Sequence, residues 1–235
     1  MELKLTKRPK SPIIIHGFPG IGLVGAIASN YLIEHLNAEP IGNIESKKIM
    51  PLAAIHNSQI VEPLGIYYDK VHNLVLFRIT TNLNGLEWYA AEMIAKLAKE
   101  LNAKEIISLE GIAVQESIEE PNAYFFSQDA KKDKLFEKIG VKKIREGVIL
   151  GATGALLLNP DLPITCILSE THSNMPDSRA AAKIIEVLDA YLNLNVDPKP
   201  LVQKAEEMES KLKEIMSKSQ QAVDLKERKD LDYFG

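Results

Sequence analysis

One apolar run, Leu74-Val-Leu-Phe-Arg-Ile79, constrains the fold more than any other feature of the sequence. A strand of this kind needs cover on both faces, as strands of a parallel sheet have when helices lie above and below them. Further short apolar strands are predicted at Ile13–Ile15, Glu105–Leu109 and Ile164–Leu168. The chain therefore needs helices on both sides of one sheet.

Amphipathic segments between these strands predict the helices. They are expected at residues 22–37, from Asn82 to Leu101, and at residues 177–194, where an acidic first turn suits the helix dipole. Alternating strands and helices of these lengths predict a layered α/β/α sandwich with a largely parallel mixed sheet.

The last part of the chain is predicted to be separate from this core. Pro198-Lys-Pro200 divides a domain of residues 1–198 from residues 199–235. Beyond it apolar positions recur about every 3.5 residues, which is typical of a helix that pairs with another helix. An amphipathic helix lying on its own domain explains the pattern as well, so both interpretations stay open. The seam positions are Leu201, Ala205, Met208, Leu212 and Ile215.

Composition limits the classes of partner that the protein can bind and indicates its cellular compartment. The net charge of −4 offers no basic surface for nucleic acid or an anionic membrane. The N-terminal residues lack the apolar region of a signal peptide, and no apolar run reaches the length of a membrane span, so a cytoplasmic protein is expected. The single cysteine, Cys166, excludes an internal disulfide and is expected to be a buried thiol in a strand. No metal-binding spacing of His or Cys is found, and no cofactor is expected.

The glycine-rich segment Gly17–Gly25 lies between the first strand and the first helix. It lacks the Lys-Ser/Thr pair of a P-loop, but Gly20-Ile-Gly22-Leu-Val-Gly25 matches G-x-G-x-x-G, with Glu45 as the one candidate for a ribose-binding acid. The alternative is that the glycines permit a tight turn and close packing of the helix on the sheet.

Polar residues follow the predicted strands where an open α/β sheet binds ligands. His16, Glu110, Glu170 and His172 lie at these ends, and the last three could supply general acid and base. The alternative is that they cap helices or close loops. The candidate ligand edge comprises Gly20, Gly22, Glu110 and His172. Trp88-Tyr89 is expected in the core or in an oligomer contact.

Four motifs, in this order, resemble the proteasome-assembly-chaperone family and more narrowly its archaeal members: Gly17–Gly25, Glu110-Gly111, Gly151–Leu157 and Met175–Ala181. The resemblance covers about residues 10–215. It implies a fold related to purine nucleoside phosphorylases, homo-oligomers, and binding to the α-ring of the 20S proteasome during assembly or activation. A paralogous assembly chaperone is a further partner that it suggests.

The resemblance also gives a role to the last three residues. Archaeal relatives use a hydrophobic-tyrosine-any tail that inserts between α subunits, and Tyr233, Phe234 and Gly235 take these places. Phe234 keeps the ring of the family's tyrosine but lacks its hydroxyl. The seam helix would be the stalk that presents the tail. A non-enzymatic adaptor is therefore expected, and the alternative is a nucleoside-like ligand site or active site at the carboxyl edge of the sheet.

Overall fold

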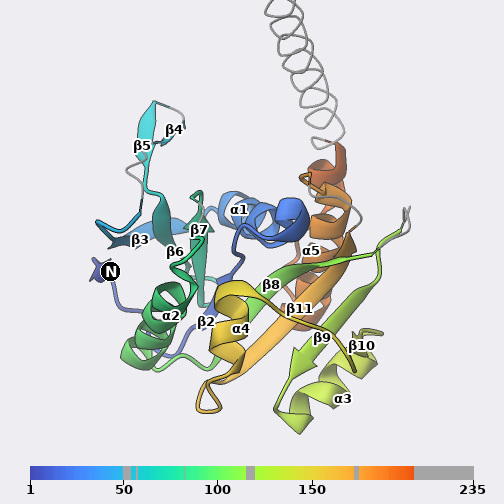
Figure 1. Cartoon of the computed structure of the whole chain (residues 1–235). Coiled ribbons are helices and arrows are strands. Elements are labelled where there is room, and N and C mark those ends of the chain that lie inside the picture. The colour runs from blue at the N-terminus through green and yellow to red at the C-terminus, as the bar shows by residue number, and fades with distance from the viewer. Residues whose placement is uncertain (50–53, 57, 82, 115–119, 172–174, 204–235) are drawn as a thin grey trace, which may run out of the picture. The chain divides into compact units, whose positions relative to one another are not determined.

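The computed structural model describes residues 1–49, 54–56, 58–81, 83–114, 120–171 and 175–203 (Figure 1). Within them, one sheet has the strand order β1-β3-β6-β7-β2-β8-β11-β9-β10, and β4 and β5 form a separate hairpin. The strands are β1 (Glu2–Leu5), β2 (Ile13–His16), β3 (Glu39–Glu45), β4 (Ala54–His56), β5 (Gln59–Val61), β6 (Leu64–Asp69), β7 (Leu74–Ile79), β8 (Glu105–Ala113), β9 (Ala123–Ser127), β10 (Lys142–Lys143) and β11 (Ile164–Thr171). The helices are the 3-10 turn η1 (Ile21–Leu23), α1 (Val24–His35), α2 (Glu87–Leu101), α3 (Ala130–Lys138), α4 (Gly151–Leu157) and α5 (Ser178–Leu192).

The centre of the sheet is parallel and its margins are antiparallel. Strands β7, β2, β8 and β11 run in one direction, and Ile13 of β2 pairs with Leu74 on one side and Glu105 on the other. On one margin β1, β3 and β6 pair antiparallel, and on the other β9 pairs antiparallel with β11. The parallel strands have the most apolar sequences, because helices cover strands of this kind on both faces.

Helices cover both faces of this centre, which confirms the layered α/β/α prediction. Helices α2 and α4 pack together on the face nearer the viewer in Figure 1, whereas α1 and α5 pack together against the sheet. Ile14 and Ile106 belong to the core under α2 and α4. Because side chains alternate along a strand, their fully buried neighbours Ile15 and Ile107 face the opposite helix layer.

Two local expectations were wrong. Helix α2 begins at Glu87 rather than at Asn82. Asp177 lies before the first turn of α5 rather than within it, and caps the helix by accepting a hydrogen bond from the amide of Ala180 at 3.0 Å. Of the two places expected for Trp88 and Tyr89, the core is excluded because they are 62% and 41% exposed, and an oligomer contact stays a prediction.

The chain divides into two compact units, Met1–Pro198 and Lys199–Gly235. In the second unit, residues 199–203 are helical and Leu201 is half-buried. The other seam positions, Ala205, Met208, Leu212 and Ile215, lie outside the described residues, so the stalk helix stays a prediction. In the described part of the chain, no helix has the length and apolar character needed to cross a membrane.

Candidate functional site

The glycine-rich turn brings α1 into direct backbone contact with the sheet. A Cβ on Gly25 would lie 2.1 Å from the carbonyl oxygen of Leu109 in β8, and one on Gly17 would lie 2.0 Å from the carbonyl oxygen of Gly25. Any side chain at these two positions would force α1 away from the sheet. The glycines therefore serve close helix–sheet packing, the second of the two interpretations of this segment.

The dinucleotide interpretation fails on the position of Glu45. In a dinucleotide site the acidic residue ends a strand beside the one that precedes the glycine turn. Here β6 and β7 separate β3 from β2. Glu45 lies at the margin of the sheet, opposite Glu2 of β1, and forms an ion pair with Lys4 at 2.7 Å.

Three polar side chains form a hydrogen-bonded chain at the carboxyl end of β8. The hydroxyl of Thr153 in α4 donates to Oε1 of Glu110 at 2.5 Å. The hydroxyls of Ser108 and Thr153 are also 2.5 Å apart, and either of them can donate this second bond. Burial raises the pKa of Glu110 to about 7, although the hydrogen bonds from Thr153 and Ser108 act in the opposite direction. Glu110 can thus gain or lose a proton near neutral pH.

His16 lies next to this chain and is fully buried. It pairs with Ser108 in the β2–β8 register, and strand alternation places it on the same face as Ile14, toward α2 and α4. Among the residues that the structure describes, neither ring nitrogen has a hydrogen-bond partner. Burial lowers the pKa of His16 to about 3, so the imidazole is neutral.

The glycine turn covers both groups. The ring of Phe18 packs edge-on against His16, with ring centroids 5.0 Å apart. A Cβ on Gly20 would lie only 3.3 Å from Oε2 of Glu110. The structure thus brings Gly20, Glu110 and His16 together, and Glu110 is only partly exposed beneath the turn.

The remaining predicted edge residues close loops. Gly22 accepts a hydrogen bond from the amide of Asp177 at 2.8 Å, and Thr171 donates to the Asp177 carboxylate at 2.8 Å. Burial alone would raise the pKa of Glu170, but hydrogen bonds from Asn122 and Tyr124 hold it below its ordinary value. Glu170 is therefore a fixed anion that ties β11 to the start of β9. His172 lies outside the described residues, and its proposed acid–base role stays a prediction.

Ser108 and Thr153 were not among the predicted site residues. Thr153 belongs to the segment Gly151–Leu157, which carries part of the resemblance, but nothing in its local sequence shows that its hydroxyl reaches Glu110. Cys166 is a buried thiol in β11, as predicted, and it pairs with Ser108 in register. Burial first, and Glu110 second, raise its pKa well above the ordinary value. In the described part of the chain, no three His, Cys, Asp or Glu side chains lie close enough to hold a metal ion.

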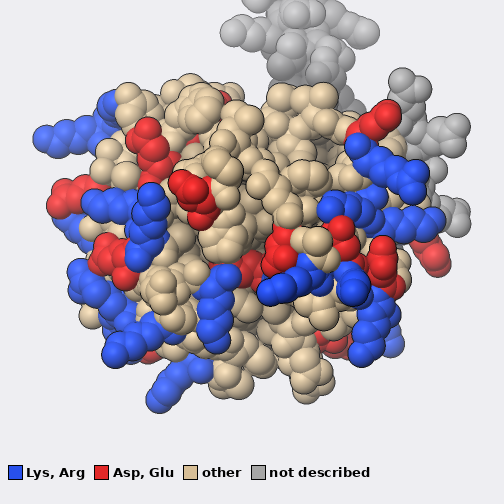
Figure 2. Space-filling model, turned by 90° about the horizontal axis from the view of Figure 1, so that it is seen from below, with Lys and Arg blue, Asp and Glu red and all other residues tan. Residues whose placement is uncertain are grey.

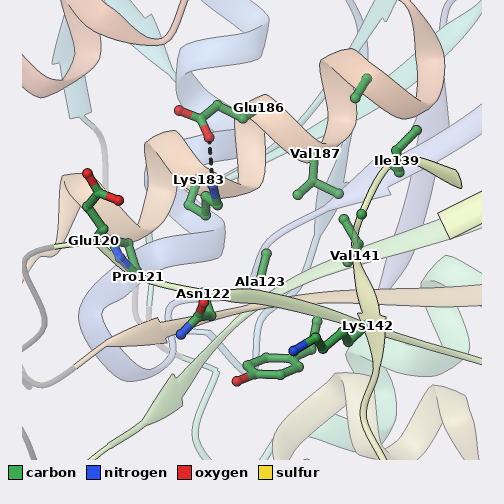
Figure 3. Close-up of a pocket in the computed structure, with 13 residues that line it drawn as sticks. Glu120, Pro121, Asn122, Ala123, Ile139, Val141, Lys142, Lys183, Glu186 and Val187 are labelled. Atoms are coloured by element: carbon green, nitrogen blue, oxygen red, sulfur yellow. Dashed lines mark hydrogen bonds and ion pairs between the residues drawn. The ribbon is translucent and has the colours of Figure 1, made fainter. Parts of the chain in front are cut away.

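A separate open cavity of about 390 Å³ lies at the outer side of the sheet, between α5, the start of β9 and the turn before β10 (Figure 3). Lys183 and Glu186 of α5 form an ion pair at 3.0 Å on one wall. Lys142 lies across from them beside β9. With charges of both signs and an internal ion pair, this cavity has no marked preference for a charged ligand.

Comparison with known proteins identifies the family. The sequence model of the PAC2 family matches residues 14–216, and the chain belongs to this family. It is 34% identical over 214 residues to the uncharacterized protein MJ0106 of Methanocaldococcus jannaschii, with 88% of this chain and 86% of that protein covered.

Two solved structures from Pyrococcus furiosus are similar along nearly the whole chain. PbaA, an archaeal homolog of proteasome-assembly chaperone, is 32% identical with a TM-score of 0.83, covering 91% of this chain and 95% of PbaA. PbaB, an archaeal proteasome activator, is 26% identical with a TM-score of 0.74, covering 92% of this chain and 98% of PbaB. The predicted family and fold are thereby confirmed.

Proposed function

We propose that this protein is a non-enzymatic adaptor that binds the α-ring of the 20S proteasome and assists its assembly or activation. The observation that carries the proposal is the similarity to PbaA and PbaB along nearly the whole chain. The segment Tyr233-Phe234-Gly235, which lies outside the described residues, is the proposed contact. Its aromatic ring would fill an apolar slot between subunits, and a carboxylate after it would pair with a lysine.

A tail of three residues binds weakly by itself, so the proposal includes a homo-oligomer that presents several tails at once. Large apolar side chains on the surface of the first unit support self-association, because such groups are commonly covered in subunit contacts. Trp88, Val148, Leu150 and Leu158 are 62%, 85%, 76% and 73% exposed.

The charge distribution supports contact through a tail rather than through an oppositely charged surface. On the face seen in Figure 2, acidic and basic side chains alternate around uncharged surface and do not segregate by sign. The net charge of −4 is also small for a chain of 235 residues. Long-range attraction to a charged ring surface is therefore not expected to dominate binding.

Surface plasmon resonance against immobilised 20S proteasome tests the proposal. The full chain should bind, and deletion of residues 233–235 or Phe234→Ala should remove at least nine-tenths of the signal. Phe234→Tyr, which restores the ring hydroxyl of the archaeal pattern, should strengthen binding. Asp232→Asn is the matched control outside the motif and should bind like the parent.

Two further measurements separate the parts of the proposal. One residue added after Gly235 should weaken binding if a carboxylate at that position pairs with a lysine. Light scattering should give a mass above that of one chain. Full-length protein that does not bind the proteasome would refute the adaptor role, and binding that survives the deletion would refute the tail as its contact.

A further inference from the structure

The turn formed by residues 17–23 is held over Glu110 in a strained conformation. Leu23 has φ 48° and ψ 21°, in the left-handed region that a branched side chain rarely adopts, and Gly22 has φ 63°. Two backbone hydrogen bonds hold this shape: the amide of Leu23 donates to Gly20 at 3.0 Å, and that of Asp177 donates to Gly22 at 2.8 Å. Strain of this kind persists only where the surroundings hold it in place.

Beneath the turn lies a polar site in which His16 alone has no hydrogen-bond partner among the described residues. His16 is fully buried with two unpaired ring nitrogens, and its neighbour Ser108 begins the hydrogen-bonded chain to Glu110. Buried polar atoms in native proteins nearly always have a partner. The closed turn therefore keeps His16 from water and leaves Glu110 only partly exposed, and both groups would be better hydrated if the turn moved.

We propose that residues 17–23 form a proton-controlled cover over the polar site at the ends of β2 and β8, closed while Glu110 is protonated and opened when Glu110 ionises. Opening hydrates the carboxylate, gives the His16 nitrogens water as a partner, and releases the strain at Leu23. It also exposes Phe18, whose ring packs on His16 in the closed state. The proposal goes beyond proteasome binding and does not depend on it.

The described surroundings of Glu110 contain no cation that would fix its charge. Ser108 on β8 and Thr153 on α4 contribute hydroxyls, the turn contributes Gly20, β2 the neutral His16, and β11 the buried thiol of Cys166. Burial is the largest influence on the carboxyl and raises its pKa from 4.5 to about 7.

The sign of the pH effect follows from this shift. The closed state disfavours the ionised carboxyl, so opening becomes easier as the pH rises from the hydrated pKa of 4.5 through the closed pKa of about 7. If the open state is fully hydrated, the opening equilibrium increases about thirtyfold between pH 5.5 and pH 8.5.

Hydrogen exchange of the Leu23 and Asp177 amides, corrected for intrinsic rates, tests this in the full chain. Both should exchange about thirtyfold faster at pH 8.5 than at pH 5.5. In Glu110→Gln the dependence should vanish, while Glu186→Gln, a carboxyl replacement at an exposed site on α5, should keep it. Because global unfolding also hydrates Glu110, the amide of Phe77 in β7 is the reference, and it should exchange more slowly than either turn amide.

Three results would overturn the proposal. They are a change below about threefold across this pH range, an unchanged dependence in Glu110→Gln, and turn amides that exchange no faster than that of Phe77. If Glu110→Gln does not fold, carbon-13 NMR of the parent carboxyl decides instead. The proposal expects the Glu110 carboxyl to titrate with a midpoint near 7, and this midpoint should rise in Thr153→Val because the Thr153 hydroxyl favours the ionised form. A titration midpoint below 5 would refute the proposal.

Discussion

Replacement of Lys132 by methionine should destabilise the first unit severely, because Lys132 neutralises a buried carboxylate. Glu105, at the start of β8, is 4% exposed. It accepts hydrogen bonds from Lys132 at 2.6 Å, from Thr165 at 2.5 Å and from Tyr191 at 2.9 Å. The ammonium of Lys132 also contacts the Tyr191 hydroxyl. The cluster ties α3 and α5 to the amino end of the central strand β8.

The size of the stability loss depends on which hydrogen-bond partners Glu105 keeps in Lys132→Met. Removal of one member of a buried ion pair costs about 3–5 kcal/mol, because the other charge stays buried without compensation. Methionine keeps most of the lysine stem and its packing, so the charge is the main loss. Thr165 and Tyr191 still donate to Glu105, and burial, followed by Glu105 itself, raises the pKa of Tyr191 and keeps its proton in place. We therefore expect a loss near the lower end, about 3 kcal/mol.

Urea unfolding followed by circular dichroism measures the loss, with Lys143→Met as the matched control. Lys143 pairs with Asp133 at 2.9 Å, but the two side chains are 38% and 32% exposed, and such a pair contributes about 0–1 kcal/mol. The double variant Lys132→Met/Glu105→Gln should recover part of the loss, because it removes the unpaired charge. If Lys132→Met lowers the free energy of unfolding by no more than Lys143→Met does, the charge of Lys132 does not stabilise the fold and the reasoning fails.

Two further changes test the packing and the electrostatics of the site. The pKa of Glu110 is higher in the folded protein than in the unfolded chain, so the free energy of unfolding should fall as the pH rises from about 4.5 through about 7, by about 3 kcal/mol in total. Glu110→Gln should remove this pH-dependent component, which is measured by urea unfolding at pH 5 and pH 8. Gly25→Ala should cost about 3 kcal/mol or more, because its Cβ would meet the Leu109 carbonyl oxygen at 2.1 Å. Gly140→Ala, at a left-handed position with open space, should cost only about 1 kcal/mol in the same assay and is its control.

The layered fold could be predicted because the signals that define it are local. The apolar run at β7 and the periodicity of α2 and α5 reflect cover by immediate neighbours, and each is readable within one segment. The strand order is not local. Glu45 looked like a candidate ribose ligand because it follows the expected second strand, but β6 and β7 lie between β3 and β2.

The polar site could be predicted only in part for the same reason. Glu110 stood out as an acidic residue at the end of an apolar strand. Its partner Thr153 lies 43 residues further along the chain, and only the placement of α4 on the sheet brings its hydroxyl within 2.5 Å. That His16 has no hydrogen-bond partner in the described part of the chain depends on side chains from several elements, which no spacing in the sequence encodes.

The four motifs that carry the family resemblance meet at one place in the fold. Gly20 covers Glu110, Glu110 binds Thr153, and Gly22 accepts the amide of Asp177. A Cβ on Gly111 would lie 2.4 Å from the carbonyl oxygen of Ile21 in the same turn.

The motifs thus describe the covered polar site at the ends of β2 and β8, and none of them includes Tyr233-Phe234-Gly235. Membership of the PAC2 family is therefore structural support for this site and only indirect support for the tail. If deletion of the tail abolishes proteasome binding, that result identifies the contact and says nothing about what the covered site does. Conversely, a pH-dependent turn would be informative even in a protein that never binds a proteasome. The two experiments address different segments of the sequence, and neither result can substitute for the other.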